Sequence, residues 1–221
     1  MTRLSFRASR SAGEVSAALT RPEAAGWLLV LAHGAGAGMT HPFMESLAAA
    51  LAHHGIASFR YQFPYMERGS RRPDPAPLLE ATVRSAVEAA ASLAGELPLL
   101  AGGKSMGGRM TSRAAAGSPL AGVRGLVFFG FPLHPAGKPG TERADHLADV
   151  DAPMLFLQGS RDRLAGLDLL RPTVGGLGSR ATLHVVADAD HSFHVPVRSG
   201  RDDADVVDEL ARTTAAWAAR Q

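Results

Sequence analysis

The feature that most constrains the fold is a regular alternation of short apolar runs with alanine-rich helical stretches from Trp27 onward. Strands of a parallel sheet covered on both faces are near-continuous apolar runs, and parallel neighbours need a crossover between them. The sequence therefore predicts an α/β fold with a mostly parallel eight-stranded sheet and helices on both faces. The expected strands are Leu4–Ala8, Glu14–Leu19, Trp27–Ala32, Ile56–Gln62, Pro98–Gly102, Val123–Phe129, Pro153–Leu157 and Ala181–Val186. The expected helices are Pro42–His53, Pro77–Leu93, Met106–Ala116, Leu164–Leu177 and Asp202–Arg220.

Two connections refine this architecture. No helix separates the first two expected strands, which indicates an antiparallel start to the sheet. About 20 residues separate Phe129 from Pro153, too few for a separate lid domain, so we expect a relatively open pocket. The 221 residues contain no linker, repeat or low-complexity tail, and we expect one domain over residues 1–221.

Composition and charge exclude several classes of protein. The chain has no cysteine, so it holds no disulfide, thiolate nucleophile, iron–sulfur cluster or Cys-ligated zinc. Its 23 Lys and Arg nearly balance 21 Asp and Glu, and its one basic cluster, Arg68, Arg71 and Arg72, is short, so nucleic-acid binding is not expected. No apolar run precedes Trp27, and none reaches the roughly 20 residues that span a membrane. We expect a cytoplasmic protein with no membrane partner, and no feature of the sequence sets its oligomeric state.

A glycine-rich segment between a strand and a helix carries the strongest chemical motif. Residues Gly102–Gly108 contain Gly-x-Ser-x-Gly, with Ser105 at its centre. A sharp turn from strand to helix strains the turning residue and needs glycine two positions away on either side. The turn exposes the hydroxyl, and the first turn of the helix leaves unpaired N–H groups. We therefore expect Ser105 to be a nucleophile and the Met106 N–H to be one donor of an oxyanion hole.

Two nucleotide-binding patterns overlap with the glycines of this chain, and neither fits. A phosphate-binding Gly-x-x-x-x-Gly-Lys-Ser loop ending at Ser105 would need its first glycine at Pro98, which has no N–H to offer. Gly34–Gly38 resembles a dinucleotide fingerprint, but its sixth position is Met39 and the next strand ends without a carboxylate for a ribose. No cofactor is expected.

The loop His33–Gly38 has a better use. Small residues directly after a strand let backbone N–H groups approach a substrate carbonyl, so we expect the Ala35 N–H or its neighbour to be the second oxyanion donor. The plainer alternative is a glycine-rich turn that only starts the next helix. His33 is expected to be a structural hydrogen-bonding residue within this loop.

A serine nucleophile needs a base and an orienting anion, and two later loops supply them. Asp162 follows the apolar run Met154–Leu157, and His191 follows the last expected strand, which is the serine, acid, base order of α/β-hydrolases. His194 is the rival base, and Asp188 and Asp190 are the rival acids. Asp162 is preferred because neighbouring side chains such as Asp190 and His191 generally point apart. A metal site of His191 and His194 lacks a third ligand, so no metal is expected. The other histidines are expected at the surface or at helix ends, namely His41, His53, His54, His146 and His184.

From Trp27 to the C-terminus the chain resembles the α/β-hydrolase superfamily. The similar stretches are His33–Met39, Phe63–Arg68, Gly102–Arg109, Pro132–Pro135 and Gln158–Asp162. They resemble a minimal, lidless subgroup that includes the testis-expressed and histone-acetyltransferase-complex hydrolase-like proteins and stands near the dienelactone hydrolases. The resemblance implies the α/β-hydrolase fold, a nucleophile elbow at Ser105, and Asp162 and His191 as relay partners. Dienelactone hydrolases proper have a cysteine nucleophile, so their substrate is not carried over, and a residue like Lys104 before the nucleophile is less usual in the superfamily.

These observations predict a carboxylesterase-like serine hydrolase that cleaves a small ester or thioester through an acyl-enzyme. The alternative is a catalytically silent α/β-hydrolase scaffold that acts as a protein-interaction subunit. Arg68, Arg71 and Arg72 are candidates for steering an acidic substrate, because their loop follows a strand whose carboxyl end should face the site. A solvated basic loop is the plainer interpretation of that cluster.

Overall fold

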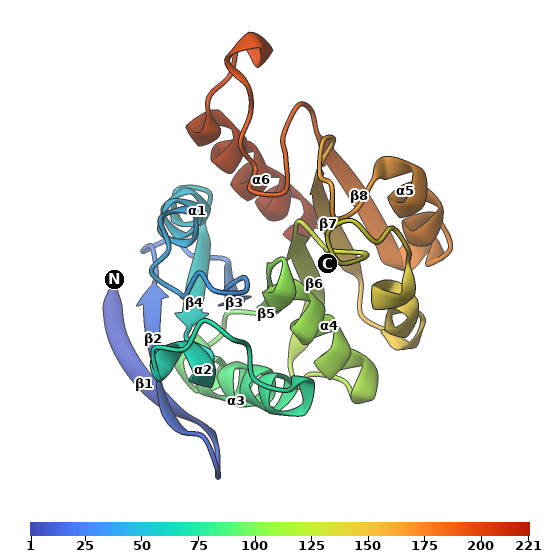
Figure 1. The fold of residues 1–221 in the computed structure, drawn as a ribbon. Helices are drawn as coiled ribbons and strands as arrows, with labels where there is room; N and C mark the ends of the chain where they lie inside the picture. The colour runs from blue at the N-terminus through green and yellow to red at the C-terminus, as the bar shows by residue number, and fades with distance from the viewer.

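The computed structural model describes residues 1–221 and contains one eight-stranded sheet in the order β1-β2-β4-β3-β5-β6-β7-β8 (Figure 1). Strands β3 to β8 are parallel, whereas β2 runs antiparallel to both β1 and β4. The strands are β1 Thr2–Ser9, β2 Gly13–Thr20, β3 Trp27–Ala32, β4 Ile56–Tyr61, β5 Leu99–Lys104, β6 Val123–Phe129, β7 Met154–Gly159 and β8 Ala181–Val186. The helices are α1 Pro42–His53, α2 Pro64–Glu67, α3 Ala76–Ala94, α4 Met106–Gly117, α5 Leu167–Gly175 and α6 Asp203–Ala218, with short 3-10 helices η1 Glu142–Asp149, η2 Gly178–Arg180 and η3 Val197–Ser199.

The predicted architecture is confirmed, including the antiparallel start and the helices on both faces. Some bounds and short elements differ from the sequence expectation. Strands β5 and β7 extend to Lys104 and Gly159, α5 is shorter at both ends than the predicted Leu164–Leu177, and α2 and the three 3-10 helices were not predicted. Helix α5 begins only after Gly166 because the Asp162 loop occupies the preceding residues, and glycines at 175 and 176 end it.

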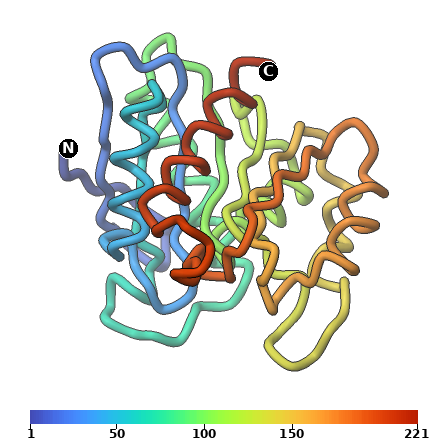
Figure 2. The backbone as a smooth tube through the Cα atoms, turned by 90° about the horizontal axis from the view of Figure 1, so that it is seen from above, coloured from blue at the N-terminus to red at the C-terminus, as the bar shows by residue number.

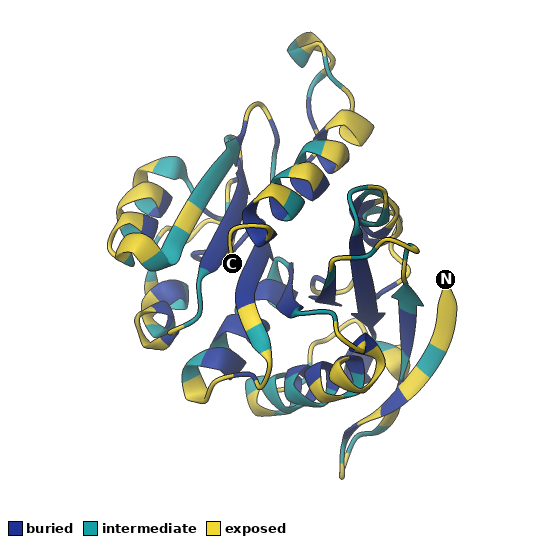
Figure 3. Cartoon of the chain, turned by 180° about the vertical axis from the view of Figure 1, so that it is seen from behind, coloured by how far each residue is buried: buried dark blue, intermediate teal, exposed yellow.

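Two apolar cores lie on opposite faces of the sheet, as the alternation within β3 shows. Leu28 and Val30 point into the larger core with α3, α4 and α5, whereas Leu29 and Leu31 point into the smaller core with α1 and α6. Figure 3 shows the consequence, with buried strands in the middle and helices that are exposed on their outer side. This double burial explains why the central strands are apolar throughout.

The sheet order reverses at β3, whose neighbours are β4 on one side and β5 on the other. The chain crosses to α1 after β3 and to α4 after β5, and these helices cover opposite faces. Ligands of open α/β sheets bind where such loops part at the carboxyl ends of the strands. The connection from β6 to β7 contains only loop and η1, so no lid domain stands above this edge (Figure 2). None of the helices is long and apolar enough to cross a membrane.

Candidate active site

Ser105 occupies the turn between β5 and α4 in a strained conformation. Its φ is 51°, a region that residues with a side chain rarely adopt. A Cβ at Gly103 would lie 2.5 Å from the Ala32 carbonyl oxygen, and one at Gly107 would lie 2.6 Å from the carbonyl oxygens of Ala32 and His33. The two motif glycines are therefore required so that the turn can pack directly against the end of β3.

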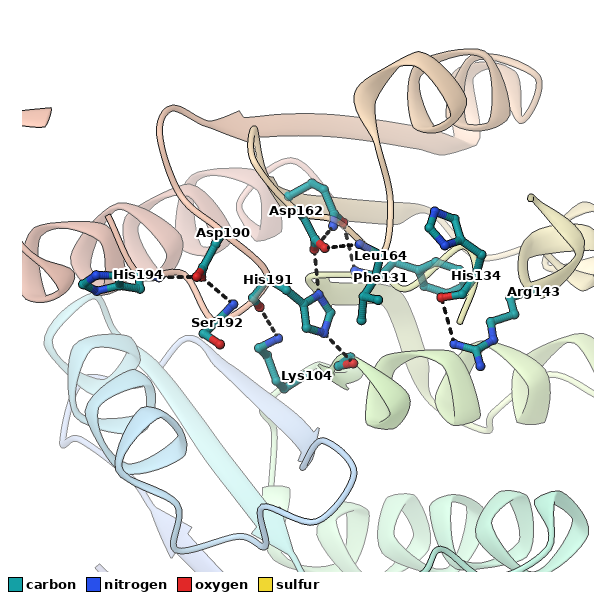
Figure 4. Close-up of polar contacts among 12 residues, drawn as sticks. Lys104, Phe131, His134, Arg143, Asp162, Leu164, Asp190, His191, Ser192 and His194 are labelled. Atoms are coloured by element: carbon teal, nitrogen blue, oxygen red, sulfur yellow. Dashed lines mark hydrogen bonds and ion pairs between the residues drawn. The ribbon is translucent and has the colours of Figure 1, made fainter. Parts of the chain in front are cut away.

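A chain of two hydrogen bonds connects Ser105 to His191 and His191 to Asp162. The Ser105 Oγ lies 2.8 Å from His191 Nε2, and His191 Nδ1 lies 2.7 Å from Asp162 Oδ2. Figure 4 shows the imidazole between the carboxylate and the serine turn. Asp162 is buried, whereas His191 keeps about a quarter of its side chain exposed, at 25%. An acceptor at Nε2 and a donor at Nδ1 is the tautomer that can take a proton from serine.

Backbone and amide donors fix the carboxylate of Asp162. The Leu164 N–H donates to Oδ1 over 2.8 Å, and the Gln158 amide donates to Oδ2. The Gln158 Oε1 accepts in turn from the Phe131 N–H over 2.9 Å, so its amide cannot rotate freely. Gln158 was not among the predicted site residues, although a polar residue in the apolar run of β7 is a sign of such a role.

The rival acids and base lie outside this chain of hydrogen bonds. Asp190 accepts at Oδ1 from the N–H groups of Ser192 and His194, so it caps its own loop. Asp188 is exposed with a φ of 59°. His194 is 64% exposed and pairs with Asp203 at 3.0 Å. His191 and His194 therefore point to different partners, and no group of three His, Asp or Glu side chains is arranged to hold a metal ion.

Two backbone N–H groups beside Ser105 have no acceptor within the chain. The Met106 N–H lies in the first turn of α4, where no preceding helical carbonyl accepts from it. The Ala35 N–H lies in the loop after β3, at an exposed residue that lines pockets together with Ser105. Free donors at these two places are what an oxyanion hole needs.

His33 fixes the loop that carries Ala35. Its Nδ1 lies 2.7 Å from the Gly34 carbonyl, and its Nε2 accepts from the Phe63 N–H over 3.1 Å. Burial lowers the pKa of His33 to about 4, so the ring is neutral and holds this one tautomer. The Tyr65 hydroxyl accepts from the Gly36 N–H and supports the same loop.

Lys104 connects the serine turn to the histidine loop. Its Nζ donates to the His191 carbonyl over 2.6 Å (Figure 4). It also lies 5.9 and 5.4 Å from the ring centres of Phe43 and Phe193. Burial lowers the pKa of the ammonium group to about 8, although the charges of Asp162 and Asp190 oppose this shift. No role for this cation was predicted from the sequence, and in the structure it is hydrogen-bonded to the residue that faces Ser105.

Two pockets meet at Ser105. One of about 220 Å³ lies toward α1 and includes Lys104 and His191, and the other, of about 450 Å³, lies toward α3 and α4 and includes Arg109 and Arg143. Both open toward solvent at the carboxyl edge of the sheet. The two parts of an ester bound at Ser105, its acyl group and its leaving group, therefore have separate pockets to occupy.

The basic cluster on the proline-rich loop does not line either pocket. Arg68 is exposed and pairs with Asp74 at 2.6 Å, and Arg71 and Arg72 are exposed. The arginines beside Ser105 are instead Arg109 and Arg143, which the sequence analysis missed. Arg109 had a sign, because it stands one helical turn after Ser105 on a helix that starts at the motif. Arg143 had none, because nothing in the short, mostly polar segment Glu142–Asp149 indicates that it packs beside α4.

The expectation for the other histidines needs correction at His146 and His184, whereas His54 lies at the end of α1 as expected. His146 is part-buried and hydrogen-bonds with the Ser112 hydroxyl at 2.7 Å. His184 contacts Glu209 at 2.6 Å from strand β8, and His54 contacts Asp208 at 2.7 Å. These contacts join elements far apart in the sequence, which spacing alone does not reveal.

Comparison with known proteins agrees with this fold. The sequence model of the family described as "Alpha/beta hydrolase domain" matches residues 25–219. A lidless serine hydrolase from Xanthomonas campestris is 21% identical, with 98% of this chain and 94% of that chain covered and a TM-score of 0.75. A dienelactone hydrolase from Anabaena variabilis is 19% identical, with coverage of 98% and 96% and a TM-score of 0.75. The esterase domain of a Rhodothermus marinus protein is 16% identical, with coverage of 99% and 98% and a TM-score of 0.74.

Proposed function

The chain belongs to the alpha/beta hydrolase domain family, and on this premise we propose that it is a serine hydrolase that cleaves a small ester or thioester through an acyl-enzyme. The observation that carries the proposal is the hydrogen-bonded chain from Ser105 through His191 to the buried Asp162. A serine alcohol is a weak nucleophile, and a neutral imidazole in contact with it supplies the missing base.

Acylation uses each of these groups once. The Ser105 Oγ attacks the carbonyl carbon of the substrate while its proton moves to His191 Nε2. The resulting oxyanion is stabilised by the N–H groups of Met106 and Ala35, each worth about 3 kcal/mol in the transition state. The tetrahedral intermediate collapses when the bond to the alcohol or thiol breaks, and the leaving group takes the proton from His191.

Deacylation repeats the sequence with water. His191 takes a proton from a water molecule as the water oxygen attacks the acyl carbon, and it returns that proton to Ser105 Oγ when the acyl–serine bond breaks. Asp162 stays ionised in both halves of the cycle. It holds His191 in the required tautomer and stabilises the imidazolium that forms twice per turnover.

The active nucleophile can be tested without knowing the substrate. A fluorophosphonate probe reacts with serines that a neighbouring base activates, so it should label the wild-type protein and fail to label Ser105→Ala. Ser118→Ala is the matched control, because Ser118 is an exposed serine at the far end of α4, and this variant should label like the wild type. Mass spectrometry of the labelled peptide identifies the serine.

Two results would contradict the proposal. An unlabelled wild-type protein that is folded would favour the catalytically silent scaffold instead. Labelling at a serine other than Ser105 would assign the chemistry to a different site. A labelled Ser105 together with hydrolysis of short-chain 4-nitrophenyl esters or thioesters would support the proposal.

A further inference from the structure

The larger pocket beside Ser105 has a wall of two arginines. Arg109 comes from the first turns of α4, and Arg143 comes from η1, which packs against that helix. The other lining residues include Met106, the proposed oxyanion donor, and apolar residues such as Leu79 and Leu164. Both cations therefore face the same space as the serine hydroxyl.

Neither arginine has a carboxylate partner. The guanidinium of Arg109 makes no hydrogen bond or ion pair with the chain, and its Nε is buried without a partner. Arg143 makes one hydrogen bond, from Nη1 to the His134 carbonyl over 3.1 Å (Figure 4). The nearby Glu80 is occupied by Arg113 at 2.6 Å. Most of the ten N–H donors of the two guanidinium groups are thus free to bind a ligand.

Cations surround this wall. Burial lowers the pKa of Arg109, and the charges of Arg143 and Arg113 lower it further, whereas Glu80 opposes them. Burial, Arg113 and Arg109 also lower the pKa of the adjacent His146 to about 4 against the opposing charge of Asp149, so this ring is neutral near pH 7. Two unpaired cations side by side repel each other, and a bound anion would remove that repulsion.

We propose that the substrate of this hydrolase carries a free carboxylate, which Arg109 and Arg143 bind in the pocket beside Ser105. The inference rests on the proposed serine hydrolase function and names its substrate class: a small ester or thioester with one carboxylate, such as a half-ester of a dicarboxylic acid. Planar guanidinium groups match the two oxygens of a carboxylate, and the pocket of about 450 Å³ accommodates a small acyl chain.

Asp74, which also lines this pocket, favours a singly charged group over a dianion. Its Oδ1 pairs with Arg68 at 2.6 Å, whereas its Oδ2 is buried without a partner, so its charge is only partly compensated. This carboxylate repels a second negative charge. A phosphate monoester would therefore meet less favourable surroundings than a carboxylate.

A matched pair of esters tests the subsite. The charged probe is mono-4-nitrophenyl glutarate, and the neutral probe is the same molecule with its carboxylate methylated. We expect the wild type to prefer the charged probe in kcat/KM, and we expect Arg109→Gln and Arg143→Gln each to lower the charged-to-neutral ratio about tenfold or more. Arg71→Gln is the control, since it removes the same charge from an exposed loop outside the pocket and should leave the ratio within about twofold of the wild-type value.

A binding measurement separates this inference from the hydrolase proposal. Calorimetry on Ser105→Ala should show that monomethyl glutarate binds, that dimethyl glutarate and inorganic phosphate bind more weakly, and that adding Arg109→Gln weakens the first by about tenfold. Arg109→Lys keeps the positive charge but loses the paired N–H donors of the guanidinium group. Its charged-to-neutral ratio of kcat/KM should lie between the values of the wild type and Arg109→Gln, a graded effect that a folding defect would not produce.

Each outcome decides one of the two ideas. Cleavage of both esters with a ratio near one that Arg109→Gln and Arg143→Gln do not change would overturn the subsite and leave the hydrolase intact. Phosphate binding more tightly than monomethyl glutarate would overturn the carboxylate assignment. If neither ester is cleaved and Ser105 is not labelled, the hydrolase proposal fails, and Arg109-dependent binding of monomethyl glutarate alone then supports or overturns the anion site.

Discussion

Lys104 stands directly before Ser105, and a single hydrogen bond joins it to the residue that faces the serine hydroxyl. The Nζ of Lys104 donates to the His191 carbonyl, so the end of β5 and the loop after β8 are held together across the site. The side chain of Lys104 is part-buried, and its ammonium group lies close to the rings of Phe43 and Phe193. A charge kept in such surroundings costs free energy and should make the stability of the protein depend on pH.

We expect the protein to become more stable between pH 8 and about 10.5 because of Lys104. Its pKa is about 8 in the folded state against 10.5 for the ordinary side chain, so between these values the unfolded chain binds more protons. The free energy of unfolding then rises with pH. From pH 7.5 to 9.5, the wild type should gain about 2 kcal/mol relative to Lys104→Met, measured by urea unfolding at each pH.

Lys138→Met is the control for this prediction, because Lys138 is the other lysine of the chain and is exposed on a loop. This variant should follow the wild-type pH dependence. Parallel curves for wild type and Lys104→Met would mean that the ammonium group is solvated in the folded protein.

Among the elements, the junction of β5 and α4 allows the least change. The two motif glycines let the first turn of α4 lie against the backbone at the end of β3, and this contact places both unpaired N–H groups near Ser105. The close approach is between backbones, so neighbouring side chains cannot relieve a clash by rotating.

We expect Gly107→Ala to destabilise the protein by about 3 kcal/mol, whereas Gly117→Ala in the same helix should stabilise it by about 0.5 kcal/mol. The new methyl group at 107 would lie 2.6 Å from two carbonyl oxygens, but at 117 the nearest atom is a side-chain nitrogen of Arg84 at 3.9 Å. Thermal and urea unfolding of both variants measure the difference. Equal stability of the two would show that the elbow can relax away from β3.

Elements set by a continuous apolar run were predictable from the sequence. The predicted bounds of β3, β6, β8 and α1 agree with the structure. Strand β3 and most of β6 are buried on both faces, β8 is a half-buried edge strand, and α1 begins at Pro42, so each leaves a local pattern of its own. Helix η1 was not predictable because its polar sequence Glu142–Asp149 is held by contacts with α4.

The site residues divide in the same way into those that a local pattern predicts and those that only the tertiary structure reveals. Ser105, Asp162 and His191 follow strand ends and could be named from order, and their hydrogen bonds are seen, while their catalytic role stays a prediction. Arg143 owes its place to the tertiary structure alone.

For the whole molecule, the decisive arrangement is the meeting of loops from both sides of the sheet at the reversal of strand order. The loop after β3 is joined there to the chain after β4 by one buried ring, His33, which contacts the Gly34 carbonyl and the Phe63 N–H. The ring packs edge-on against Phe63 and Tyr65, with centres 5.0 and 6.0 Å away. Protonating it would replace the acceptor at Nε2 by a donor facing another donor.

Acid should therefore destabilise the fold through His33. Its pKa is lowered from 6.5 to about 4 in the folded protein, so as pH falls below 6.5 the unfolded chain binds a proton that the folded protein does not. The stabilising contribution of neutral His33 is fully present above pH 6.5 and is lost as the pH falls toward 4. The loss of unfolding free energy at pH 4 is about 3 kcal/mol. The side chain of His33→Gln cannot titrate, so between pH 7 and pH 4 this variant should lose about 3 kcal/mol less unfolding free energy than the wild type, measured in urea.

His53→Gln is the control, because it replaces an exposed histidine, and it should lose as much unfolding free energy as the wild type. Should His33→Gln instead lose as much as the other two, the imidazole must be able to take up its proton in the folded state, and the loop that carries Ala35 would have to open in acid without unfolding the sheet.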